Sequence, residues 1–356
     1  MAVFSIPDIK ISGISACVPE DEYNNHDYDW ISEKDRETLI RTIGVERKRY
    51  ATQGTTTSDL CFTAANKLLN DLKWDKSEID ILIFVSQSRD YIIPATAGIL
   101  QDKLGLPKTC MAFDISLGCS GYIYSLSVMG SLMATGRLKK GLLLAGDIST
   151  LNTSYKDKSA FPLFGDAGTA TAIELKNNVS EMMFNLQTDG KGYEAIIIPD
   201  GGIRNFVNRD SSFNYEEISE GICRNKLNIA LDGIEVFNFS LREVTPNIKK
   251  ILKQFSFSSE DIDYFVFHQA NKLMNETIRK QLKLPEEKVP YSLKNYGNTS
   301  SASIPLTIVT ELNYEVSHKK LKLLLSGFGV GLSWGSVILE TKSIICPEIL
   351  IQNKTD

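Results

Sequence analysis

The sequence lacks the long apolar runs of membrane proteins and the basic excess of nucleic-acid-binding proteins. Its 356 residues carry a formal net charge of -5, so we expect no positively charged surface for nucleic acid. No run of about 18 apolar residues occurs, and residues 1–20 show no cationic leader followed by an apolar core. We therefore expect a cytoplasmic protein that binds neither nucleic acid nor a membrane.

Histidines and closely spaced cysteines are also scarce. The chain has 3 histidines and 6 cysteines, and no two cysteines form a C-x-x-C pair. This spacing argues against a zinc site and against a disulfide framework, so we expect no metal and interpret five of the cysteines as structural thiols. There is no P-loop motif and no strand-borne G-x-G-x-x-G, which disfavours a phosphate-binding loop.

The sixth cysteine, Cys119, lies in MAFDISLGCSGYIYSL at residues 111–126. An apolar run ends at Gly118, and Ser120-Gly121 begin a segment whose apolar spacing is typical of a helix. This pattern places Cys119 at a strand-to-helix turn, where the N–H groups and dipole of a helix N-terminus favour the nucleophilic thiolate. The alternative is that Cys119 is simply a small buried hydrophobic residue.

Two patterns of the first half recur in the same order in the second half. SEIDILIFVSQ at 77–87 is echoed by SSEDIDYFVFHQA at 258–270. GLLLAGD at 141–147 and FGDAGTATAIEL at 164–175 are echoed by LKLLLSGFGVGLSWGSVILE at 321–340. Alternating helices and buried strands predict an α/β protein with an internal duplication and mostly parallel sheets covered by helices.

The rest of the sequence predicts where helices, strands and irregular stretches begin and end. We expect helices over 57–72, 95–104 and 242–258 and a strand over 8–18. Three stretches read as irregular: 21–50, 176–225, which would bridge the halves and roof a site, and the tail 346–356. We expect two halves, 1–176 with the cysteine nucleophile and 177–356 with the bridging loops and the candidate histidine and asparagine.

Three stretches of the second half could complete a site around the cysteine. His268 ends the apolar strand YFVFH where a helix begins, although an isolated histidine is more often a satisfied core residue. Asn298 lies in NYGNTSSASIPL at 295–306, where its amide could serve an oxyanion or merely cap a turn. The alternating glycines of GFGVGLSWGS at 327–336 permit close backbone approach, as an oxyanion hole requires.

Together these stretches resemble the β-ketoacyl-[acyl-carrier-protein] synthase III family of the thiolase superfamily. The resemblance rests on DISLGCSGYIYSL, FGDAGTATAIEL, DGIEVFNF, FVFHQAN, YGNTSSASIP and GFGVGLSWGS, in the family's order, from about Lys10 to Glu340. It implies the five-layered α-β-α-β-α thiolase fold with two similar halves. It also implies a homodimer, with coenzyme A or acyl-carrier-protein thioesters as substrates and no permanently bound cofactor.

The resemblance assigns roles to the candidate residues. Cys119 would accept an acyl group, and His268 and Asn298 would donate hydrogen bonds to a malonyl thioester carbonyl as decarboxylation makes it an enolate. Backbone N–H groups of Cys119 and of the Gly329-Val330-Gly331 loop would form a second oxyanion hole. Further substrate-binding residues are implied at Trp30, Ile93, Asn271, Lys272, Arg279 and Phe328.

The chain departs from the family at several of these positions. Gly329-Val330-Gly331 stands where the family often has three consecutive glycines, which would reshape the acyl pocket. Lys272-Leu273 follows HQAN where an arginine is common two residues beyond the Asn, so docking of the carrier protein would fall to Lys272 or Arg279. Ile93 matches an apolar residue that crosses the dimer and lines the partner's acyl tunnel.

The leading prediction is therefore a condensing enzyme of fatty acid biosynthesis. Its cysteine would be acylated from acyl-coenzyme A or acyl-carrier protein, and decarboxylative condensation with a malonyl thioester would give a β-ketoacyl product. One alternative is an acyltransferase that passes the acyl group to an amine or hydroxyl in a specialised or polysaccharide pathway. A cysteine hydrolase and an inactive partner subunit agree less well with the motifs.

Overall fold

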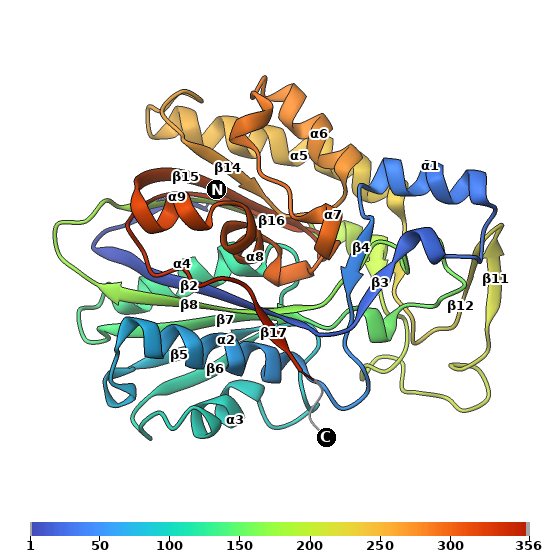
Figure 1. Ribbon diagram of the computed structural model, residues 1–356, viewed down its shortest axis with the longest axis horizontal. Helices are drawn as coiled ribbons and strands as arrows, with labels where there is room; N and C mark the ends of the chain where they lie inside the picture. The colour runs from blue at the N-terminus through green and yellow to red at the C-terminus, as the bar shows by residue number, and fades with distance from the viewer. Residues whose placement is uncertain (1, 354–356) are drawn as a thin grey trace.

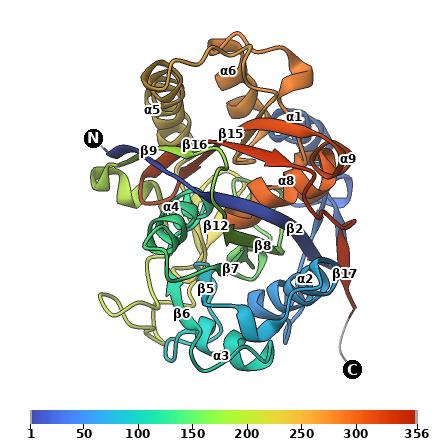
Figure 2. The same ribbon diagram turned by 90° about the vertical axis from the view of Figure 1, so that its left-hand side faces the viewer.

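The computed structural model describes residues 2–353, whose helices and strands form five layers. In Figure 1, helices α5 (Gly233–Gln254) and α6 (Lys272–Gln281) lie above one β-sheet, and α2 (Thr57–Leu72) lies below another. Helices α4 (Gly121–Met133) and α8 (Ser303–Glu311) lie between the two sheets. Figure 2 shows the same order of layers from the side. The predicted α-β-α-β-α architecture is confirmed.

The two sheets repeat one topology. The strands of the first sheet are, in spatial order, β17 (Leu350–Gln352), β2 (Ile9–Pro19), β8 (Ala167–Leu175), β7 (Lys140–Asp147), β5 (Ile81–Val85) and β6 (Met111–Ile115). Those of the second are β1 (Ala2–Ile6), β9 (Met182–Thr188), β16 (Ser333–Lys342), β15 (Lys320–Gly329) and β14 (Tyr264–Phe267). The series β2-β8-β7-β5 and β9-β16-β15-β14 both contain two antiparallel pairs followed by one parallel pair. The predicted internal duplication is thereby confirmed.

The expectation of mostly parallel sheets holds for the first sheet and is wrong for the second. In the first sheet the pairs β17–β2, β7–β5 and β5–β6 are parallel, and the two pairs that flank β8 are antiparallel. In the second sheet, as far as the structure describes it, β15–β14 is parallel and the other pairs are antiparallel. The apolar run ILIFV, which suggested a parallel strand, is β5 and is parallel to both neighbours.

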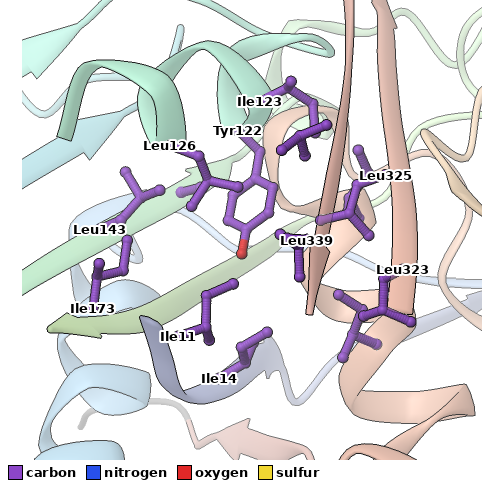
Figure 3. Packing of buried hydrophobic residues seen from close by; sticks show 14 of the residues in the cluster. Ile11, Ile14, Tyr122, Ile123, Leu126, Leu143, Ile173, Leu323, Leu325 and Leu339 are labelled. Atoms are coloured by element: carbon purple, nitrogen blue, oxygen red, sulfur yellow. The ribbon is translucent and has the colours of Figure 1, made fainter. Parts of the chain in front are cut away.

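Helix α4 lies at the centre of the molecule and begins directly after the turn that holds the cysteine. Its sequence, GYIYSLSVMGSLM, has no charged residue, as expected for a helix that is buried on all sides. In Figure 3, Tyr122 and Leu126 lie between Ile173 of the first sheet and Leu325 of the second. The Tyr122 hydroxyl pairs with the Thr171 hydroxyl at 3.0 Å. Packing on both sides therefore fixes the start of this helix.

The predicted helix over 57–72 is confirmed as α2. The Thr56 side chain accepts a hydrogen bond from the Asp59 N–H, and the Asp59 carboxylate accepts one from the Thr56 N–H, which is a capping box. The predicted helix over 95–104 is confirmed as α3 (Thr96–Lys103). The helix expected over 242–258 begins earlier, because Asp232 caps α5 by accepting hydrogen bonds from the N–H groups of Ile234 and Glu235.

The stretches that read as irregular contain regular structure. In or next to these stretches lie α1 (Glu33–Ile43) and the antiparallel pairs β3 (Glu22–Asn24) with β4 (Arg47–Arg49), β10 (Ile196–Ile197) with β13 (Ala230–Leu231), and β11 (Glu216–Ser219) with β12 (Ile222–Arg224). Two further short helices, α7 (Leu293–Tyr296) and α9 (Asn313–His318), lie elsewhere in the second half. Residues 21–50 therefore hold a helix and two strands, and residues 176–225 hold the sheet strand β9. The expected tail includes β17, which pairs with β2, while residues 354–356 lie outside the described part.

Each terminal strand joins the sheet that is built mainly by the other half of the chain. Strand β1 pairs with β9 in the second sheet, and β17 pairs with β2 in the first. The predicted division of the chain into the halves 1–176 and 177–356 stays a prediction. The terminal strands link these repeats across the molecule.

Candidate active site

Cys119 lies in the turn between β6 and α4, as the sequence predicted. The Gly121 N–H donates to the Gly118 carbonyl at 2.7 Å, which closes the turn around the cysteine. The Ser120 hydroxyl pairs with the Ser333 hydroxyl at the start of β16 at 2.7 Å. The turn of the first half is thus tied directly to a strand of the second.

The glycine-rich segment after β15 lies against the cysteine. A Cβ placed on Gly329 would be 2.9 Å from the Cys119 Sγ, and this glycine has a φ of 151°. Only a residue without a side chain allows so close an approach. The neighbouring backbone N–H of Val330 donates toward the sulfur. This contact is the one that an oxyanion site beside a reactive thiol needs.

The resting state of the thiol differs from the sequence prediction. Burial raises the pKa of Cys119 to about 11, whereas the backbone N–H of Val330 and the Ser300 hydroxyl act in the lowering direction. The helix N-terminus was expected to favour the thiolate. Desolvation outweighs these donors, so the neutral thiol is favoured.

His268 follows β14 and is buried. Its backbone N–H donates to the Ser326 carbonyl at 2.8 Å, and its ring Nδ1 lies 2.7 Å from the Ser303 hydroxyl. The edge of the ring meets Phe328, with ring centroids 5.6 Å apart. Burial lowers the pKa of His268 to about 3, so the imidazole is neutral. When the Ser303 hydroxyl donates to Nδ1, the proton resides on Nε2, which can then act as a donor.

Asn298 is held at both its backbone and its side chain. Its N–H donates to the Leu163 carbonyl at 2.9 Å, and its carbonyl accepts from the Gly165 N–H at 3.1 Å. Its side-chain oxygen accepts from the Ser300 N–H at 2.9 Å, and its amide nitrogen donates to the Ala270 carbonyl at 3.3 Å. An amide nitrogen carries two N–H groups, so one remains for a ligand.

Two glycines, Gly165 and Gly297, permit the close approach between the backbone near Asn298 and the backbone near Leu163. A Cβ on Gly165 would be 2.1 Å from the Tyr296 carbonyl oxygen, and a Cβ on Gly297 would be 2.6 Å from that of Leu163. Gly297 also has a φ of 65°, a conformation that favours glycine. The motifs FGDAG and YGNTS therefore meet and fix Asn298.

The three candidate catalytic residues line one cavity of about 400 Å³. The other predicted site residues that line it are Asn271, Phe328, Gly329 and Val330. The candidate set of Cys119, His268 and Asn298, which is spread over 180 positions of sequence, is thus brought together.

Five predicted binding residues are not among those that line the cavity: Gly331, Trp30, Ile93, Lys272 and Arg279. The Trp30 indole donates to the Gly221 carbonyl of the β11–β12 turn at 3.2 Å. Ile93 is 83% exposed. Arg279 is buried and forms ion pairs with Glu276 and Glu286 at 2.7 and 3.1 Å, so its guanidinium is engaged within its own half.

Asp147 is a residue of the site that sequence reasoning missed. It is buried at the end of β7, and burial raises its pKa. One carboxylate oxygen accepts from the Gln87 N–H at 2.7 Å and the other from the Ser301 hydroxyl at 2.8 Å. The aspartate therefore joins the strand ends of the first half to the turn that follows Asn298. The only sequence signal was a charged residue at the end of the apolar run GLLLAGD.

No group of three or more His, Cys, Asp or Glu side chains that could hold a metal ion occurs within residues 2–353. Over the same range, none of the helices combines the length and the hydropathy that spanning a membrane requires. The cysteines of the described chain are all free.

Comparisons with known proteins identify relatives of the whole chain. Family models described as 3-oxoacyl-[acyl-carrier-protein] synthase III match residues 113–190, and models of its C-terminal part match residues 252–341. A relative from Campylobacter jejuni, provisionally named a 3-oxoacyl-[acyl-carrier-protein] synthase 3, is 38% identical over 97% of both chains. A β-ketoacyl-[acyl-carrier-protein] synthase III from Syntrophomonas wolfei is 31% identical over 93% of this chain and 97% of its own. The crystal structure of a 3-oxoacyl-(acyl-carrier protein) synthase from Burkholderia xenovorans superposes with a TM-score of 0.92 at 37% identity, covering 98% of this chain and 99% of that one.

Proposed function

The chain belongs to the 3-oxoacyl-[acyl-carrier-protein] synthase III family, and we propose how its site performs the condensation of that family. It is a condensing enzyme that joins an acyl group to a malonyl thioester with loss of carbon dioxide. The roles of individual residues below are our proposal. The observation that carries it is one cavity lined together by Cys119, His268 and Asn298.

In the first half-reaction, the sulfur of Cys119 attacks the carbonyl carbon of an acyl thioester. The new S–C bond forms as the bond to the donor's sulfur breaks, and the donor leaves as a free thiol that carries the proton of the cysteine. Negative charge develops on the carbonyl oxygen, and we assign the backbone N–H groups of Cys119 and Val330 to its stabilisation. Ionisation of a thiol with a raised pKa is coupled to substrate binding in this scheme.

In the second half-reaction, a malonyl thioester occupies the cavity. Its carboxylate leaves as carbon dioxide, and the electron pair of the broken C–C bond passes into an enolate. The Asn298 amide and the Nε2–H of His268 donate hydrogen bonds to the enolate oxygen. The enolate carbon then attacks the acyl carbon on Cys119, and the thiolate is the leaving group. A neutral histidine can fill this role, because its Nε2–H donates while Nδ1 accepts from the Ser303 hydroxyl.

We assign the substrates and the assembly by the same proposal. The donors are acyl-coenzyme A or acyl-carrier protein, and the enzyme falls in the acyltransferase class. A homodimer is supported by three consecutive exposed apolar residues, Tyr91, Ile92 and Ile93, of which the first two also line a second cavity. Lys272 remains a candidate for docking the carrier protein, and the cytoplasmic location remains a prediction. No contact in the site favours transfer to an amine or hydroxyl acceptor.

Intact-protein mass spectrometry tests the first half-reaction. The protein is incubated with a panel of acyl-coenzyme A donors, and an increase equal to the mass of one acyl group is expected. The Cys119→Ala variant should gain no mass. Cys223 is the one cysteine that is not buried, so Cys223→Ala is the matched control and should acylate like the unchanged protein. An adduct that survives Cys119→Ala would overturn the nucleophile assignment.

A further inference from the structure

A second cavity adjoins the active-site cavity. It is also about 400 Å³, and its lining includes Thr55, Thr56 and Thr57. The residues Gln87, Ser88 and Arg89 line both cavities. This short segment, which follows β5, is therefore part of the boundary between the two cavities, together with Ile148 and Asn152.

The Gln87 side chain reaches the backbone next to the nucleophile. A Cβ placed on Gly118 would be 2.5 Å from the Gln87 Oε1 and 2.7 Å from a Val330 methyl carbon. The side chains of Gln87 and Val330 therefore meet over Gly118, one residue before Cys119. They limit the space on this side of the sulfur.

The amide of Gln87 has unused hydrogen-bonding capacity. Its backbone N–H is anchored to Asp147, but its side-chain oxygen and nitrogen make no hydrogen bond within residues 2–353. The adjacent Ser88 hydroxyl, by contrast, pairs with the Thr57 hydroxyl and accepts from the Ile148 N–H. Of the two, only the Gln87 side chain is available to a ligand.

The lining of the active-site cavity combines apolar and polar side chains. The apolar ones include Ile196, Ile197, Ile229, Leu231, Val236 and Met274. The polar ones include Gln87 and its chain neighbours Ser86 and Ser88. An acyl group on Cys119 therefore enters a cavity that offers both kinds of contact.

We propose that Gln87 is a specificity-determining residue that selects an acyl group bearing a hydroxyl. This rests on the proposed function, because it concerns the acyl group that Cys119 receives. An amide presents an acceptor at its oxygen and donors at its nitrogen. A hydroxyl both donates and accepts, so it pairs with either end of the amide, whereas a plain alkyl chain would leave the amide unpaired when it expels water.

Acylation rates with matched donors test this. Butyryl- and 3-hydroxybutyryl-coenzyme A have acyl chains of equal length and differ by one hydroxyl. The rate constant for acylation of Cys119, followed by intact mass, should be about three- to tenfold higher for the hydroxyacyl donor, as one net hydrogen bond allows. The ratio is measured within one protein, so it does not depend on the fraction that is correctly folded.

Three variants sharpen the measurement. Gln87→Leu keeps the approximate size and removes the amide, so the preference should disappear or reverse. Gln87→Ala opens the boundary toward the second cavity, and acylation by hexanoyl-coenzyme A should rise by about tenfold for two more buried methylenes. Gln254→Leu, at the exposed end of α5 and away from both cavities, is the matched control and should keep the unchanged ratio.

A preference of the unchanged protein for butyryl-coenzyme A would overturn the proposal, as would an unaltered ratio in Gln87→Leu. Either result would leave the condensing function standing, because acyl-enzyme would still have formed. Failure of every donor to acylate Cys119 would instead overturn the proposed function, and the specificity proposal with it.

Discussion

The Cys119 thiol is neutral at rest because burial affects its pKa more than the N–H donors around it do. Burial raises the pKa to about 11, so below that value the thiolate fraction grows tenfold for each unit of pH. The rate of alkylation of Cys119 by iodoacetamide should therefore rise about tenfold per pH unit between pH 7 and 9.

The measurement follows the mass of the intact protein. The rate measured for Cys119→Ala is subtracted, because it reports alkylation of the other cysteines. A rate that reaches a plateau near pH 7 would show a pre-formed thiolate. That result would restore the sequence prediction of a thiol acidified by the helix N-terminus.

Asn298 should matter for the second half-reaction and not for the first. Its free amide N–H is the proposed donor to the enolate, and loss of one such donor typically lowers a rate by about 10²- to 10³-fold. We expect Asn298→Ala to acylate at Cys119 but to release carbon dioxide from malonyl thioester at that reduced rate. Equal losses in both half-reactions would instead indicate a general disturbance of the site.

The local motifs singled out Cys119, His268 and Asn298 but left a plain structural interpretation open for each, and the family resemblance assigned their roles. The structure adds that the three side chains line one cavity. Gln87 and Asp147 could not be predicted in this way. Their roles depend on contacts with Gly118 and Ser301, which are distant in the sequence and meet only in the fold.

Strand β15 and the turn into β16 form the element that closes the site over the sulfur. Gly329 lies so close to Cys119 that a single added carbon at this position would press on Sγ. Gly329→Ala should therefore lower the acylation rate by about 10²-fold or more, since a shift of about 1 Å in a reacting group has that effect.

The control for this element is Gly136→Ala, because a Cβ on Gly136 meets nothing within 4 Å. Gly136 also has a positive φ, of 84°, so the control reports the backbone strain alone. Acylation in Gly329→Ala at the rate of this control would contradict the steric account.

Elements were predictable where the apolar pattern was strong. Helix α2 was placed correctly by its apolar spacing. Helix α1 was missed because its outer surface is polar, although Ser32 caps its start and Gly44 ends it in the left-handed conformation. Strand β17 was missed because three residues carry little pattern, and its pairing with β2 is a tertiary contact.

The whole molecule has an apolar surface that its own chain does not cover. Tyr91, Ile92 and Ile93 are 60%, 71% and 83% exposed, and exposed apolar side chains in sequence are typical of an interface. We expect a dimer in light scattering coupled to size exclusion, and Ile92→Asp with Ile93→Asp should shift it toward the monomer. A monomeric unchanged protein would contradict the proposed assembly.

The duplicated architecture was predictable at this scale, since two strand patterns recur in order. The exchange of terminal strands between the sheets was not, because β1 and β17 are short and pair far from their neighbours in the chain. The duplication also explains the site: the cysteine comes from the first repeat, and both proposed donors come from the second.

One measurement tests the central claim, that acyl-Cys119 condenses with a malonyl thioester, most directly. Acyl-enzyme is isolated, mixed with malonyl thioester labelled in its free carboxylate, and followed for labelled carbon dioxide and for the mass of the protein. We predict that carbon dioxide is released in step with the loss of the acyl mass, in equal amounts. Loss of the acyl group to water, an amine or an alcohol without release of carbon dioxide would contradict the account.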